Sequence, residues 1–133
     1  MKQLFRFIVV ISTLLYVIFW FLPYVDYLWL TEYEIELASA EGYGGYIPQS
    51  LVLAWAQLII WVVISVGLFF FIPLARTAFV LMLVITAITN FLWGFLVMEP
   101  ISAGLISIIT TSDGVILTMM YLTSLSKYFE KSA

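Results

Sequence analysis

The chain has 133 residues, of which 65% are hydrophobic and 10% charged, and its formal net charge is −3. Soluble domains are nearer half apolar and a quarter charged, so this composition excludes an ordinary soluble domain and predicts one integral membrane domain over residues 1–133. Cys and His are both absent, which excludes disulfides and thiolate or imidazole ligation of a metal or haem, and we expect neither a metal nor a cofactor.

Four apolar runs, at about 7–22, 51–72, 77–98 and 101–126, approach or exceed the length that crosses a bilayer. The runs are continuous and lack period-two alternation, so they predict helices rather than strands. Lys2 and Arg6 ahead of the first run also suit a secretory signal peptide, with 38–40 as a small-x-small cleavage pattern. That pattern lies far beyond the apolar run, so we expect a retained first helix. The predicted fold class is an all-α integral membrane protein, a four-transmembrane-helix bundle.

The five basic residues predict how the bundle is oriented. With four spans they all fall on one side of the membrane: Lys2, Arg6, Arg76, Lys127 and Lys131. Cytoplasmic loops carry the excess of Lys and Arg. We therefore expect both termini in the cytoplasm and the chain in the cytoplasmic (inner or plasma) membrane.

The predicted outer loop, residues 24–50, is acidic. Thr31 followed by Glu34 fits a capping box, which favours a short helix on the outer surface. The alternative is a strand, because acidic and apolar residues alternate from Glu32 to Leu37. The outer acids could gather a divalent cation: Asp26, Glu32, Glu34, Glu36, Glu41 and Glu99. Their spacing matches no known calcium loop, so a solvated acidic surface is the favoured interpretation.

Asp113 lies near the middle of the fourth predicted span. A carboxylate at this depth costs roughly 2.5 to 3.5 kcal/mol on insertion scales, and is by default a hypothesis of function. It can be protonated and donate a hydrogen bond between helices, line a wet cavity that takes protons or cations, or pair with a cation from another subunit. It can also cap a helix that breaks at 112–114, as transporter helices do.

Four other polar side chains lie at similar or shallower depth, counted at 1.5 Å per residue. Thr86 and Ser65 are near the level of Asp113, while Asn90 and Gln57 are nearer the outer side. Together with Asp113 they form a candidate intramembrane polar site. Polar groups of this kind commonly only join neighbouring helices.

The fourth span also carries a row of small side chains at steps of three and four. Its members are Ala103, Ser107, Thr110, Gly114 and Thr118. Such rows let helices approach closely in lipid. We expect this small-residue stripe to face spans two or three of the same chain, with a seam between two copies as the alternative. Asp113 projects about 100° away from it.

These features predict a small non-enzymatic membrane protein that acts as a subunit or interaction partner in a membrane assembly. Its expected partners are the lipid bilayer and either a second copy of itself or another membrane protein, and not nucleic acid. The alternative is an oligomeric transporter or channel that moves protons or small cations past Asp113. An enzyme is not expected, because Asp113, Asn90 and hydroxyl groups are a poor set for acid–base chemistry at neutral pH.

Overall fold

The computed structural model describes residues 1–38, 44–46, 50–94 and 97–130, and the regular structure within these ranges is helical. Four helices are long and apolar enough to cross a membrane: α1 (Lys2–Phe21), α3 (Leu51–Phe69), α4 (Pro73–Leu92) and α5 (Pro100–Leu122). The short elements are η1 (Leu22–Tyr24), η2 (Asp26–Leu28), α2 (Glu32–Ala38) and α6 (Ser126–Glu130). The all-α class with four such helices is confirmed, and so is the helix between the first two of them.

The helix ends differ from the predicted spans. α4 begins at Pro73 rather than 77, because proline suits the first helical position, and it ends at Leu92 rather than 98, two residues before Gly94 with its positive φ of 85°. α5 ends at Leu122 rather than 126, since Thr123 is extended and donates its hydroxyl to the Met119 carbonyl. α1 begins before residue 7, and α3 ends before residue 72. Four residues used in the predictions above lie outside the described ranges: Ser39, Ala40, Glu41 and Lys131.

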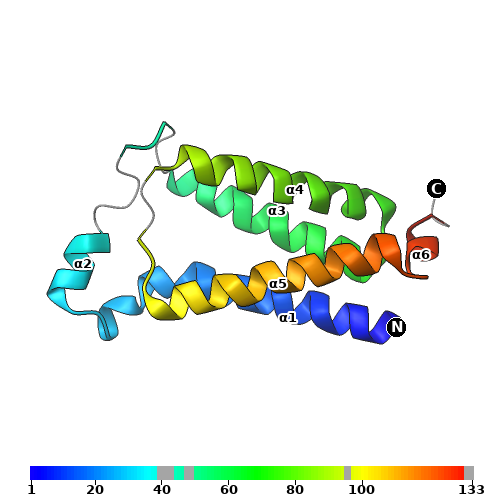
Figure 1. The fold of residues 1–133 in the computed structure, drawn as a ribbon, viewed down its shortest axis with the longest axis horizontal. Helices are drawn as coiled ribbons and strands as arrows, with labels where there is room; N and C mark the ends of the chain where they lie inside the picture. Colours follow the sequence, from blue (N-terminus) through cyan, green and yellow to red (C-terminus); the bar gives the residue numbers. More distant parts are fainter. Residues whose placement is uncertain (39–43, 47–49, 95–96, 131–133) are drawn as a thin grey trace.

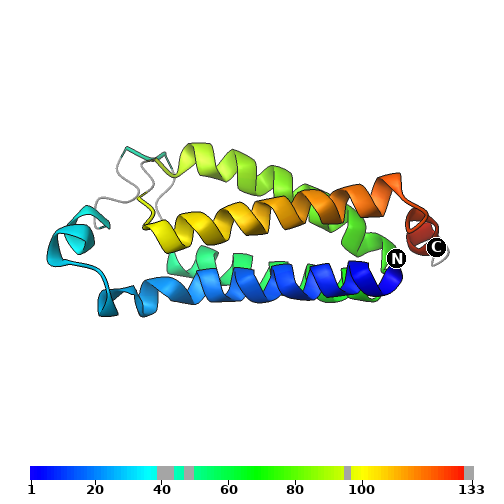
Figure 2. The ribbon, with the colours of Figure 1, turned by 60° about the horizontal axis from the view of Figure 1, so that its bottom comes forward.

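Helix α1 packs along both α3 and α5, and α4 packs on α3. The long helices run side by side, with α2 at one end of the molecule and α6 beside the start of α1 at the other (Figures 1 and 2). We refer to these as the α2 end and the α6 end.

The main buried cluster lies toward the α6 end. It joins all four long helices and α6, through Phe5, Val9, Trp61, Ile64, Leu68, Phe71, Ala75, Phe79, Ile116, Met119, Met120, Leu125 and Phe129. Phe71, in the turn between α3 and α4, has a φ of 58°, which is rare for a bulky residue. Its ring stacks on Phe5 at 5.4 Å and meets Phe129 edge-on at 5.3 Å between centroids. These contacts hold the turn in its left-handed conformation.

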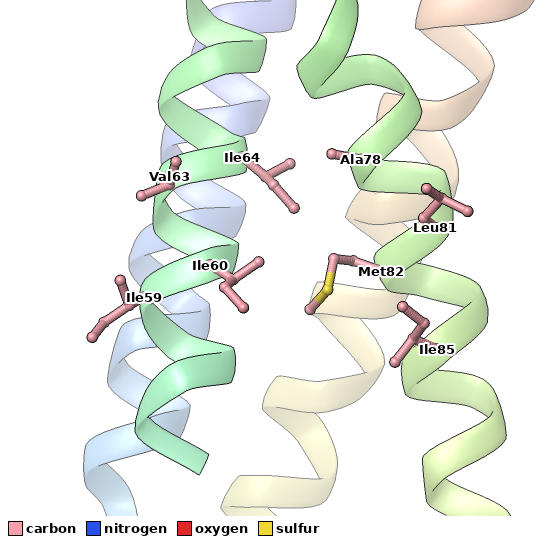
Figure 3. A pocket seen from close by; sticks show the side chains of 8 residues that line it. All are labelled: Ile59, Ile60, Val63, Ile64, Ala78, Leu81, Met82 and Ile85. Carbon is pink, nitrogen blue, oxygen red and sulfur yellow. The ribbon is translucent and has the colours of Figure 1, made fainter. Parts of the chain in front are cut away.

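Helices α3 and α4 approach each other closely beside Gly67. A Cβ atom placed there would lie 2.6 Å from the Cβ of Ala75, so only glycine fits. Farther along the pair, a groove of about 340 Å³ opens between the two helices (Figure 3). Its lining is entirely aliphatic or thioether: Ile59, Ile60, Val63, Ile64, Ala78, Leu81, Met82 and Ile85. It offers no polar group to a ligand.

We predict that Gly67→Ala lowers the free energy of unfolding by about 1–3 kcal/mol, because the added methyl group forces α3 away from α4. Denaturant titration of the protein in detergent micelles measures the change. Gly104→Ala is the matched control, since no atom lies within 4 Å of a Cβ at that position. Equal effects of the two substitutions would contradict the close approach.

Candidate functional site

Asp113 is buried in the middle of α5, with 7% of its surface exposed. The helix continues through residues 112–114, so the broken-helix alternative is not the one adopted. Neighbouring hydroxyls support this continuity: Thr110, Thr111 and Ser112 donate to backbone carbonyls four residues earlier, at 2.8–2.9 Å. Their polar atoms are thereby satisfied within the helix.

Ser12 on α1 donates its hydroxyl to Oδ1 of Asp113, at 3.3 Å. Ser12 is 3% exposed, so the bond lies inside the seam between α1 and α5. Sequence reasoning did not select Ser12. The available signal was its position near the middle of the first span, at a depth comparable with that of Asp113 on an antiparallel helix.

Tyr16 lies one helical turn after Ser12, on the same face of α1. Its side chain lies near that of Gln57 on α3 and near the Asp113 carboxyl group. Its ring packs on Trp61 with centroids 5.4 Å apart. Polar side chains therefore follow one another from the buried pair Asp113 and Ser12 to the half-buried Tyr16 and Gln57, toward the α2 end. We refer to this row as the polar seam. Gln57 was predicted to belong to the site, whereas Tyr16 was not.

The other predicted site residues lie elsewhere. Ser65 is buried, but it lines a groove between α1 and α3 together with Thr13. Thr86 and Asn90 are on α4, which packs on α3 and α6. Thr86 is half-buried, with its carbonyl accepting from the Thr89 hydroxyl, and Asn90 is exposed. Equal depth did not bring these side chains to Asp113, because depth does not say which face of a helix a residue occupies.

The small-residue stripe faces outward. Ser107, Thr110, Gly114 and Thr118 are exposed, and Ala103 is half-buried. A Cβ atom at Gly114 would meet nothing within 4 Å. The expectation that the stripe packs on spans two or three is therefore wrong. The buried side of α5 is the one that carries Ile109, Asp113, Ile116 and Met120.

At the α2 end, two acids cap helices. Glu34 accepts from the Thr31 amide at 2.8 Å and the Thr31 hydroxyl at 2.7 Å, and the Glu34 amide donates back, which confirms the capping box. Glu99 caps α5, accepting from the amides of Ile101 at 2.6 Å and Ser102 at 2.7 Å. Partial desolvation alone would raise the pKa of Glu99, but the hydrogen bonds from Ser102 and Ile101 outweigh it and lower the pKa. These two acids act as helix caps.

Nothing matches in comparisons of this chain with protein-family models, with curated proteins or with solved structures. The described residues thus form an all-helical protein with four helices apolar enough to cross a membrane, and its polar seam between α1, α3 and α5 is buried at Ser12 and Asp113.

We predict that Ser12→Ala lowers the free energy of unfolding by about 1 kcal/mol, because Asp113 loses its donor inside the seam. Denaturant titration in micelles gives the value. Ser107→Ala serves as the control, since that hydroxyl is exposed and bonds within its own helix. An equal loss of unfolding free energy in Ser107→Ala would show that the hydrogen bond from Ser12 to Asp113 does not stabilise the protein specifically.

We predict that Glu99→Ala weakens the start of α5 and lowers stability by about 1 kcal/mol at neutral pH. Because the pKa of Glu99 is lower in the folded than in the unfolded protein, its carboxylate contributes fully to stability at pH values above the unfolded pKa. This contribution to stability is lost as the pH falls through the lowered, folded-state pKa. The stability difference between native protein and variant should therefore shrink on acidification, as followed by thermal unfolding across pH. A difference that grows toward low pH would contradict the cap, and Glu130→Ala controls for a general loss of negative charge.

Proposed function

We propose that this chain is a small non-enzymatic membrane protein that acts as a subunit or interaction partner in a membrane assembly, with the outward face of α5 as its packing surface. The observation that carries the proposal is the exposed small-residue stripe. The partner is a second copy of the chain or another membrane protein.

The surface of the stripe suits helix packing in lipid. Association there depends on close contact and dispersion rather than on the hydrophobic effect, so small side chains and glycine favour it. The hydroxyls of Ser107, Thr110 and Thr118 already bond to carbonyls of their own helix at 2.8–2.9 Å. A partner helix can therefore cover them without leaving a buried donor unsatisfied.

The position of Asp113 favours a structural role over contact with another subunit. Its carboxylate is enclosed between α1 and α5 and receives the Ser12 hydroxyl. A cation from a neighbouring subunit would have to enter this seam to reach it. Asp113 then joins two helices of one chain, while the exposed face of α5 that carries the stripe is left for a partner.

The absence of His and Cys supports a role without catalysis. Among the described residues, the polar side chains that approach Asp113 are Ser12 and Tyr16, and neither is a base that titrates near neutral pH. We further propose that the α6 end, which carries Lys2, Arg6, Arg76 and Lys127, faces the cytoplasm in the inner or plasma membrane.

The alternative is an oligomeric proton or small-cation transporter. The seam from Gln57 through Tyr16 to Asp113 favours it, because it could form one half of a polar path from the α2 end. The buried apolar cluster weighs against it, since it closes the bundle between Asp113 and the α6 end. A through-path would require these side chains to separate.

We predict that the native protein assembles in lipid nanodiscs and that Gly114→Leu reduces the assembled fraction by about tenfold or more, because a bulky side chain keeps a partner helix away from the stripe. Native mass spectrometry measures the assembly. Ala87→Leu is the control, since Ala87 is also exposed but lies on α4.

The same measurement on Asp113→Asn should give assembly like that of the native protein. Loss of assembly in Asp113→Asn alone would contradict the proposal that Asp113 is structural and that the stripe is the assembly surface. Proton flux into liposomes that Asp113→Asn abolishes would instead favour the transporter.

A further inference from the structure

A second groove, of about 270 Å³, lies between α1 and α3. Val10, Thr13 and Leu14 form one wall, and Ser65, Val66 and Phe69 contribute to the other. Val10, Leu14 and Val66 are exposed, so the groove is open to the surroundings of the bundle. In a membrane those surroundings are hydrocarbon.

The groove presents an apolar surface. Thr13 donates its hydroxyl to the Val9 carbonyl at 2.7 Å, which satisfies its polar hydrogen within α1. An aliphatic chain fits such a lining, whereas a polar ligand would find no partner there.

Arg6 lies at the end of this groove nearest the α6 end. It is on the same face of α1 as Val10 and Thr13, about one and two turns before them. Its Nε donates to the Phe69 carbonyl at 3.1 Å, and its guanidinium carbon lies 4.9 Å from the centre of the Phe69 ring. The side chain therefore spans from α1 to the end of α3.

This hydrogen bond uses one of the five N–H groups of the guanidinium. Within the described ranges no carboxylate pairs with Arg6. Arginine binds phosphate through two parallel hydrogen bonds, and its remaining N–H groups permit that geometry.

We propose that this groove is a binding site for one anionic phospholipid, with an acyl chain along α1 and α3 and the phosphate on Arg6. Charge at this end favours an anionic headgroup, since Lys2, Arg6, Arg76 and Lys127 lie here against the single described acid, Glu130. The site is separate from the stripe on α5 and does not depend on the role proposed for the stripe.

The test is native mass spectrometry of the full chain with phosphatidylglycerol or phosphatidylcholine carrying the same acyl chains. The native protein should retain one phosphatidylglycerol in preference to phosphatidylcholine, and Arg6→Gln should reduce its retention by about tenfold. Arg76→Gln is the matched control, because it removes the same charge from the same end. Equal losses in the two variants would overturn the assignment of the headgroup to Arg6.

A second variant separates lipid binding from folding, since Arg6 also bonds to the Phe69 carbonyl. Val66→Phe narrows the groove but leaves Arg6 in place, and it should lower retention of phosphatidylglycerol with an unchanged thermal midpoint in detergent. Retention at the native level in Val66→Phe would overturn the groove as the acyl site. A lipid-free dimer blocked by Val66→Phe would also overturn the proposal, because the groove would then be an interface between copies.

Discussion

Helix α1 packs along two other helices at once, α3 and α5, and it takes part in both polar and apolar contacts of the bundle. Phe5 and Val9 join the buried cluster near the α6 end, while Ser12 and Tyr16 reach Asp113 and Gln57 farther along. Since lipid offers no hydrogen-bond partners, a polar group inside the membrane must find its partner in the protein. Helix α1 provides that partner for the one carboxylate placed deep in a helix.

Polar side chains on the buried and exposed sides of α5 find their hydrogen-bond partners in different ways. On the buried side, Asp113 uses a hydroxyl from a different helix. On the exposed side, serine and threonine hydroxyls use carbonyls of their own helix. The exposed hydroxyls are thus satisfied without a partner helix, which leaves these small side chains available for packing. This difference underlies the proposed separation between a structural carboxylate and an assembly surface.

Much of the helical architecture could be predicted from the sequence, because composition and run length decide whether a helix can cross a bilayer. Neighbouring residues were equally informative where the interaction is between residues close in the sequence, as in the Thr31–Glu34 capping box. The orientation of the stripe and the partner of Asp113 were not predictable in this way. Counting along the chain gives the depth of a residue, but its neighbours depend on which helices pack together. Ser12 was therefore missed, and Thr86 was grouped with Asp113 although its helix, α4, packs on α3 and α6.

The left-handed turn at Phe71 links distant parts of the chain. The ring is covered by Phe5, near the beginning of the chain, and by Phe129, near its end. During synthesis α3, the turn and α4 emerge well before α6. Of these two rings, only that of Phe5 is then present to contact Phe71. The turn between α3 and α4 therefore completes its packing only after α6 has left the ribosome.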